Sequence, residues 1–181
     1  VLTKLGDHSM AEYKDTLALA YYKEALDLQN GYMPALLGES EVYRTRRNFP
    51  EFFKTLNMFV EDEQTDVQTK TQYLSMLVSR TDPRFIQNVR PQIDSLYDNL
   101  VSCHPKDSSA LTASGLYWYS TGRTDKAKSL IHKNMILHPD NLGATATYAQ
   151  LLGYMKEWET LEKTCDSAIV RFPKETAFLD M

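Results

Sequence analysis

Histidine and cysteine side chains are the groups in this 181-residue sequence best suited to bind a metal ion or to act as nucleophiles. His104 and His138 each precede a proline and lie 34 residues apart, and the two cysteines are Cys103 and Cys165. A zinc ion needs each ligand within about 2 Å, and a disulfide needs Cα atoms within about 7 Å of each other. The spacing puts both pairs on separate helices, and even neighbouring helices lie about 10 Å apart. We therefore expect no metal site, and two free thiols in the core.

Sequence motifs that carry catalytic chemistry are absent. The chain has no G-x-x-x-x-G-K phosphate loop, no H-E-x-x-H zinc pair and no G-x-S-x-G nucleophile turn. Its seven glycines are too scattered to surround a phosphate group. We therefore expect a protein that is not an enzyme and that needs no cofactor.

The charge balance argues against nucleic acid as a partner. The chain carries 20 Lys and Arg against 24 Asp and Glu, a formal net charge of −4, whereas binding to a phosphate backbone requires a basic surface. One basic cluster, Arg44, Arg46 and Arg47, is interpreted as a solvated turn, with a small anion-binding patch as the alternative. No apolar stretch reaches the length of about 18 residues that a membrane span needs, so we expect no membrane insertion by this segment. The residues indicate no cellular compartment.

Prolines reveal an internal repeat. Pro105, Pro139 and Pro173 are spaced by 34 residues, and each ends an apolar run with helical spacing. Counting back places equivalent helix ends at Gln64 and Asn30. A period of this length indicates helical units that bury their apolar faces against one another. We expect a single array with units at residues 1–32, 33–66, 67–107, 108–141 and 142–175, and with residues 176–181 beginning a further helix.

The residues inside this period resemble the tetratricopeptide repeat (TPR) family. The fourth unit carries the resemblance most clearly, because small residues stand where its two helices would meet. Its matching residues are Leu111, Ser114, Gly115 and Trp118, followed by Gly122, Ala127, Ile131 and Pro139. The resemblance implies an all-α fold, a TPR-type right-handed superhelical solenoid of antiparallel helix pairs.

Two departures from the repeat pattern lead to local expectations. Asn134 interrupts an apolar seam, and because an unpaired buried amide costs about 1–3 kcal/mol, we expect it to be hydrogen-bonded. The third unit contains seven extra residues near Asp82 and Pro83, a pair that is typical of a helix start. We expect these residues to lengthen the second helix of that unit at its start, with a kink or break at Pro91.

The TPR resemblance also implies a function. TPR arrays line a concave face with the first helix of each unit, and members of the family bind peptide segments there. The resemblance places Leu37, Glu41, Arg44, Thr71, Ser75, Thr112, Leu116, Tyr119, Gln150 and Tyr154 on that face. These residues lack the Lys, Asn and Arg pattern with which some TPR domains hold the carboxylate tails of heat-shock chaperones. We expect a protein-binding scaffold with a protein or peptide partner, although Tyr119 and Tyr154 can equally serve packing.

Other functions stay open on the sequence. The chain can be a regulatory or assembly region of a longer protein whose activity lies outside these residues, which the incomplete helices at both ends favour. Exposed ends of an array can also support self-association. RNA binding, as in the related pentatricopeptide repeats, is disfavoured by the acidic charge.

Overall fold

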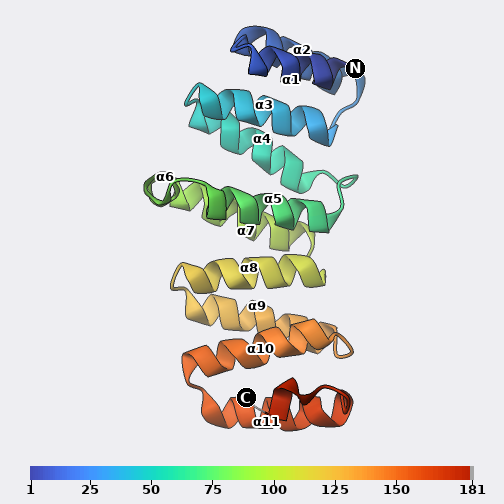
Figure 1. Cartoon of the computed structure of the whole chain (residues 1–181), viewed down its shortest axis with the longest axis vertical. Helices are drawn as coiled ribbons and strands as arrows, with labels where there is room; N and C mark the ends of the chain where they lie inside the picture. Colours follow the sequence, from blue (N-terminus) through green and yellow to red (C-terminus); the bar gives the residue numbers. More distant parts are fainter. Residues whose placement is uncertain (180–181) are drawn as a thin grey trace. The chain divides into compact units, whose positions relative to one another are not determined.

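The computed structural model describes residues 1–179, and these residues form eleven α-helices, one short 3-10 helix and no strand (Figure 1). The predicted all-α fold is therefore confirmed. The helices fall into two compact units, unit 1 from Val1 to Cys103 and unit 2 from His104 onward. That the two units continue one array remains a prediction. Within residues 1–179, no helix combines the length and the apolar character that crossing a bilayer requires.

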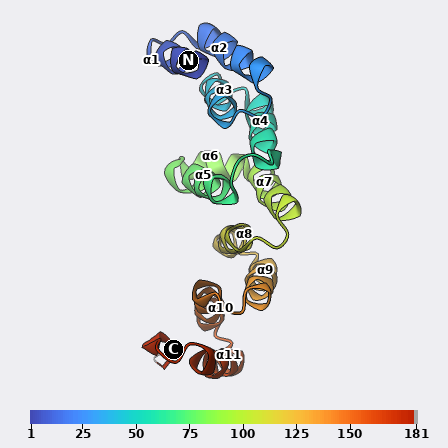
Figure 2. The ribbon, with the colours of Figure 1, turned by 90° about the vertical axis from the view of Figure 1, so that its right-hand side faces the viewer.

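Unit 1 contains helices in two layers. In Figure 2, the first helices α1, α3 and α5 lie on one side of this unit and the second helices α2, α4 and α7 on the other. Large side chains such as Tyr22, Phe52 and Phe59 are fully buried in this unit. Its helices are α1 (Leu2–Ala11), α2 (Asp15–Leu28), α3 (Met33–Thr45), α4 (Phe49–Glu61), α5 (Val67–Arg80), α6 (Pro83–Asn88) and α7 (Arg90–Cys103).

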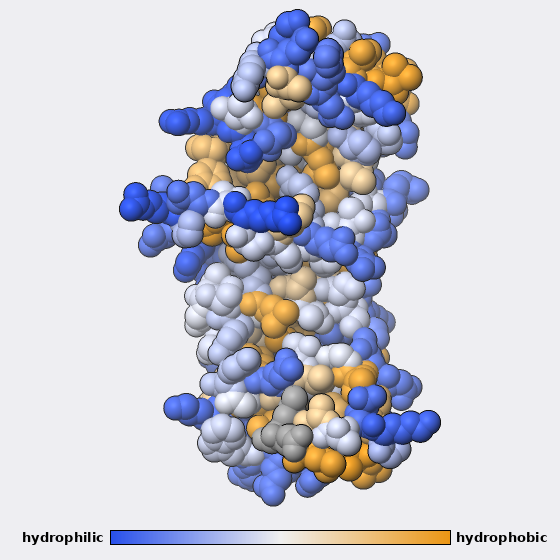
Figure 3. All heavy atoms as spheres, in the orientation of Figure 1, coloured by the Kyte–Doolittle hydropathy of each residue, from blue (hydrophilic) through white to orange (hydrophobic). Residues whose placement is uncertain are grey.

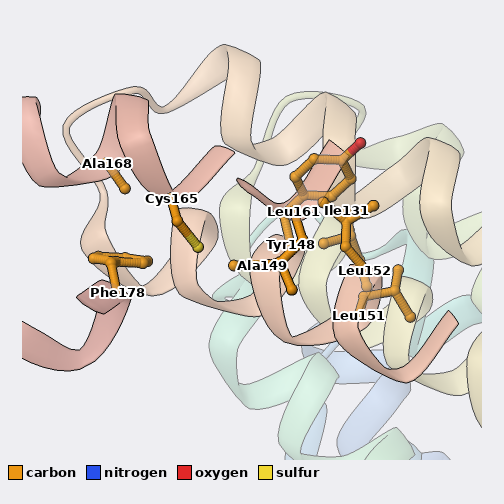
Figure 4. Close-up of a cluster of buried hydrophobic side chains, with 9 residues drawn as sticks. All are labelled: Ile131, Tyr148, Ala149, Leu151, Leu152, Leu161, Cys165, Ala168 and Phe178. Carbon is orange, nitrogen blue, oxygen red and sulfur yellow. The ribbon is translucent and has the colours of Figure 1, made fainter. Parts of the chain in front are cut away.

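Unit 2 repeats the layered arrangement with two further helix pairs. The first helices are α8 (Ser108–Ser120) and α10 (Leu142–Met155), and the second helices are α9 (Thr124–Leu137) and α11 (Trp158–Arg171). Figure 4 shows its buried cluster, in which Ile131, Leu152 and Leu161 come from three different helices. At the other end of this cluster, Phe178 lies beside Cys165 and Ala168.

The last residues only partly test the expectation of a further helix. Thr176–Leu179 forms a 3-10 helix, and its Phe178 is buried. The expected helix was to run through residue 181, and residues 180 and 181 lie outside the described residues.

Short polar side chains start several first helices. The carboxylate of Asp66 accepts a hydrogen bond from the Thr69 N–H at 2.8 Å, and that of Asp107 accepts one from the Ala110 N–H at 2.9 Å. The amide oxygen of Asn141 accepts from the Ala144 N–H at 3.1 Å. These bonds satisfy N–H groups that have no partner within the helix, which fixes where each helix begins.

The turn between the first and second helix of a pair has a recurring backbone conformation. Tyr13, Arg47, Gly122 and Lys156 all have a positive φ, between 56° and 81°. The N–H of each following residue donates to a carbonyl five positions back, as from Asn48 to Tyr43 at 2.9 Å. This is the left-handed helix ending that favours glycine, and only one of the four positions holds it.

The third helix pair departs from the prediction. Asp82 caps a helix as expected, because its Oδ1 accepts from the Arg84 N–H at 2.7 Å. The extra residues, however, form a separate six-residue helix, α6, and do not extend α7. The break lies at Val89, two residues before Pro91. A helix tolerates proline in its first turn but not in its interior. α7 therefore begins at Arg90, one residue before Pro91.

The prediction for Asn134 is confirmed. Its buried Nδ2 donates to the Thr112 Oγ1 at 2.8 Å and to the Ser108 carbonyl at 3.3 Å. The amide therefore joins α9 to α8, although its Oδ1 has no hydrogen-bond partner among the described residues.

Glu39 is a buried carboxyl group in unit 1. Its Oε1 accepts a hydrogen bond from the Tyr43 hydroxyl at 3.1 Å, and only 8% of the residue is exposed. Burial raises the pKa of Glu39 above its ordinary value, and the Tyr43 hydrogen bond only partly opposes this shift. The charged form therefore destabilises the folded state.

Replacing Glu39 with Gln should stabilise the chain in a pH-dependent way. The pKa of Glu39 is raised in the folded state relative to 4.5, so wild-type stability falls as the pH rises above that value. The E39Q variant should have a higher unfolding free energy than wild type at pH 7 and no such gain at pH 4, measured by urea denaturation. The exposed Glu24→Gln serves as control. An equal effect of E39Q at both pH values would contradict the prediction.

Replacing Gly115 with Ala should destabilise unit 2. A Cβ at Gly115 would overlap the Cγ1 atom of Ile131, a stiff, fully buried side chain. Such overpacking costs about 1–3 kcal/mol of unfolding free energy. Gly153→Ala is the matched control, because a Cβ there meets only the Leu161 Cδ2 at 3.8 Å. G153A should be neutral or stabilising by up to about 1 kcal/mol, and similar losses in both variants would refute the steric argument.

Candidate functional site

The predicted site residues of unit 1 lie on α3 and α5. Leu37 and Glu41 are partly exposed on α3, and Arg44 and Ser75 are exposed. Thr71 is different, because only 7% of it is exposed and its hydroxyl donates to the Gln68 carbonyl at 2.9 Å. Thr71 is therefore buried in unit 1 and offers little surface to a partner.

Glu41 and Arg44 form a bidentate ion pair. The Arg44 Nε donates to the Glu41 Oε2 at 2.7 Å, and its Nη2 donates to Oε1. This hydrogen bonding raises the pKa of Arg44 above its ordinary value. The planar fork of a guanidinium matches a carboxylate, so each residue neutralises the other and holds its position.

A hollow of about 540 Å³ lies beside this ion pair, where the ends of α3 and α5 meet the start of α6. Phe49 and Phe85 pack against each other in its lining, with ring centroids 4.9 Å apart. Tyr73 also lines it, and burial raises the pKa of that phenol. The other lining residues are Glu41, Arg44, Arg47, Met76, Leu77, Arg80, Thr81 and Asp82.

The predicted site residues of unit 2 gather on α8 and α10. The rings of Tyr119 and Tyr154 stack with centroids 6.0 Å apart and an interplanar angle of 25°. Tyr154 is 72% exposed and Leu116 is 49% exposed. Gln150 is exposed one turn before Tyr154, and Thr112 is held by Asn134. Unit 2 thus presents an aromatic and apolar surface, the tyrosine patch, formed by Leu116, Tyr119 and Tyr154.

The surface view agrees with this description. Figure 3 shows hydrophobic residues at the level of α8 and α10, surrounded by residues of intermediate hydropathy. Neither α8 nor α10 contains a charged residue.

The residues with metal-binding or nucleophilic potential lie apart. No group of three or more His, Cys, Asp or Glu side chains within residues 1–179 is arranged to hold a metal ion. A ring nitrogen of His138 bonds to the Lys106 carbonyl at 2.7 Å, which gives this histidine a structural role. Both cysteines are free, but Cys103 is exposed and only Cys165 is buried, so the expectation of two core thiols is wrong for Cys103.

Most residues that line the hollow in unit 1 could not be predicted from the sequence. The repeat register predicts Glu41 and Arg44, whereas Arg47 belongs to the basic cluster that is interpreted as a solvated turn, with a small anion-binding patch as the alternative. The register does not identify Tyr73, Arg80 or Phe85, because they come from the degenerate third repeat and from α6. The available signal was the insertion itself, since extra residues in a repeat add structure beside the regular helices.

Comparison with known proteins identifies the fold. No model of a protein family matches the sequence, and no curated protein matches it. Solved structures do match along almost the whole chain. YrrB, described as a TPR protein with an unusual peptide-binding site, shares 18% identity at a TM-score of 0.54, with 99% of this chain and 89% of that chain covered. The fold is that of the TPR proteins.

Two further TPR-fold structures support the same conclusion. A thermophilic TPR protein of Thermus thermophilus shares 16% identity at a TM-score of 0.54, with 99% of this chain and 94% of that chain covered. MamA shares 17% identity at a TM-score of 0.53, with the same two coverages. The close pairing of TPR helices is thus present without close sequence similarity.

The two thiols should differ in reactivity in the folded protein. Cys103 is exposed, whereas Cys165 is buried in unit 2 and its burial raises the pKa of the thiol. Because the thiolate is the reactive form, a thiol reagent at pH 8 should label Cys103 at least about tenfold faster than Cys165. The Cys103→Ser variant should retain only the slow phase, and both thiols should react at once in denaturant. A fast phase in C103S would contradict this assignment.

Proposed function

We propose that this chain is a non-catalytic protein-interaction scaffold that binds a segment of a partner protein on its first-helix faces. The observation that carries the proposal is the tyrosine patch of unit 2. Tyr119 packs against the buried cluster of that unit, whereas its stacking partner Tyr154 is 72% exposed. Packing within the unit accounts for Tyr119 but not for the exposed ring of Tyr154.

The chemistry of the patch suits a protein partner. A tyrosine supplies a large apolar surface and a hydroxyl at little cost in side-chain entropy, and tyrosines are enriched among residues that dominate binding energy. The stacking with Tyr119 holds the Tyr154 ring in place before a partner arrives. Leu116 adds an apolar contact, and the hydroxyl of Ser120 and the amide of Gln150 lie on the same two helices. Such a mixture favours a segment with apolar or aromatic side chains and a hydrogen-bonding backbone.

The fold supports the same proposal. TPR-fold structures include YrrB, whose description names a peptide-binding site. Within each unit the first helices lie on one side (Figure 2), and stacked helix pairs of this kind create extended binding surfaces. An extended surface suits recognition of a chain segment.

A non-catalytic role fits the environment of the ionisable groups. The shifted pKa values belong chiefly to buried tyrosines and to surface ion pairs with evident structural partners. Burial raises the pKa of Tyr97 to about 12, for example, and the Glu157 hydrogen bond raises the pKa of Lys128. Neither group stands beside a nucleophile in a cleft, which is the arrangement that indicates catalysis.

Removing the two tyrosines of the patch should weaken partner binding. We expect the double variant Tyr119→Ala, Tyr154→Ala to retain its helical content but to weaken partner binding by at least about tenfold, which corresponds to about 1.4 kcal/mol. The measurement is a quantitative proteomic pulldown with the intact chain, the double variant and a control, followed by titration of each recovered partner.

Trp158→Ala is the matched control. Trp158 is an equally large aromatic residue of unit 2 and is 61% exposed, but it begins the second helix α11. Proteins that the intact chain and W158A recover in the pulldown, but the tyrosine variant does not, bind the proposed face. Identical recovery with all three baits would refute the assignment of binding to this surface.

A further inference from the structure

We propose that the hollow of unit 1 binds an acidic side chain that stands next to a large apolar one in a partner segment. This inference rests on the proposed function and gives the chemistry of one contact. It concerns the hollow between α3, α5 and α6, which lies entirely within unit 1.

Unpaired positive charge is the first observation. Arg47 and Arg80 both line the hollow and are exposed, and neither makes an ion pair or a side-chain hydrogen bond with another residue in the range 1–179. Three arginines and two carboxylates line the hollow, which leaves one positive charge in excess. Glu41 holds Arg44, and the Oδ1 of Asp82 caps α6. Two free guanidinium groups therefore stand in a chain whose net charge is −4.

An aromatic floor is the second observation. Phe49 and Phe85 pack 4.9 Å apart between ring centroids at an angle of 55°, and Tyr73, Met76 and Leu77 complete the apolar lining. Met76 is 45% exposed, so apolar surface there remains open to solvent. A volume of about 540 Å³ lies within the range of about 300–1,000 Å³ that is typical of binding pockets.

Together these groups select a mixed ligand. A guanidinium binds carboxylate or phosphate oxygens through paired N–H donors, so the arginines alone do not distinguish a carboxylate from a phosphate. The apolar floor favours an acidic side chain with an apolar neighbour, because a phosphate group has no apolar surface to bury against that floor. An Asp or Glu beside a Phe, Trp or Leu would place its carboxylate between Arg47 and Arg80 and its apolar neighbour against Phe49 and Phe85.

The hollow combines the insertion in the third unit with a residue of a recurring turn. α6 consists of the extra residues of the third unit and contributes Phe85. Arg47 occupies the left-handed turn after α3, with a φ of 56°, which fixes the direction in which its side chain leaves the backbone. Binding specificity of this kind is therefore a property of this chain rather than of the helical repeat.

The test is selection of a random dodecapeptide phage library on the intact chain and on variants. Wild type should enrich peptides with Asp or Glu next to Phe, Trp or Leu. The double variant Arg47→Glu, Arg80→Glu should bind those peptides at least about tenfold more weakly and should instead enrich Lys or Arg beside the apolar residue. Phe85→Ala should keep the acidic preference and lose the apolar one.

A control with the same change in net charge is Lys133→Glu, Lys174→Glu, at two exposed residues of unit 2. This variant should select the same peptides as wild type, and circular dichroism should show equal helical content in all proteins. Selection without an acidic preference, or selection unaffected by R47E/R80E, would overturn the inference. So would displacement of the bound peptides by millimolar inorganic phosphate together with loss of the apolar preference, since the hollow would then be a phosphate site.

The two proposals fail separately. Peptides that are lost with the variant Tyr119→Ala, Tyr154→Ala but kept with R47E/R80E support the scaffold function and refute the acidic contact. Peptides that are lost only with R47E/R80E support the acidic contact and refute the assignment of binding to the tyrosine patch.

Discussion

The close approach of neighbouring helices is the constraint on which the rest of this structure depends. Gly6 on α1 and Gly38 on α3 both face the ring of Tyr22 on α2, and a Cβ at either position would overlap that ring. One buried aromatic residue therefore sets the spacing of three helices, and its hydroxyl is held by the Asp7 Oδ1 at 2.7 Å. In unit 2 the same relation joins Gly115 to Ile131. With the backbones held this close, the positions that face away from each contact become exposed surface at regular intervals along the helices.

Much of the fold could be predicted because the helix contacts leave a periodic trace in the sequence. The spacing of Pro105, Pro139 and Pro173 located helix ends, and the position of Asn134 in an apolar seam predicted the hydrogen bonds that it makes to α8. The differences between prediction and structure have a common cause. Periodicity specifies that a residue is helical more securely than it specifies the direction in which its side chain points, and the third repeat is degenerate. Thr71 was therefore expected at the surface but is buried, and Cys103 was expected in the core but is exposed.

The candidate binding surfaces show the same division between regular and irregular sequence. The tyrosine patch lies on first helices with a clear register, which predicts Leu116, Tyr119 and Tyr154. The structure adds the stacking of the two tyrosines and the exposure of Leu116 and Tyr154. The hollow of unit 1 combines residues of α3, of the turn after it, of the start of α4, of the degenerate helix α5 and of the inserted helix α6. No repeat pattern predicts the inserted helix, so the repeat register does not bring Arg47, Arg80 and Phe85 together. The regular repeats supply the framework, and the irregular segment supplies a surface specific to this chain.

The left-handed turn at Arg47 has a consequence for how this chain can change over time. A non-glycine residue in this conformation bears a strain of about 1–2 kcal/mol, and the equivalent turn after α8 avoids it by using Gly122. Glycine at position 47 would relieve the strain and remove one of the two unpaired guanidinium groups of the hollow. Folding and the proposed binding of an acidic side chain therefore favour different residues at this position. Among descendants of this sequence, glycine at position 47 would indicate selection for stability, and arginine would indicate selection for binding.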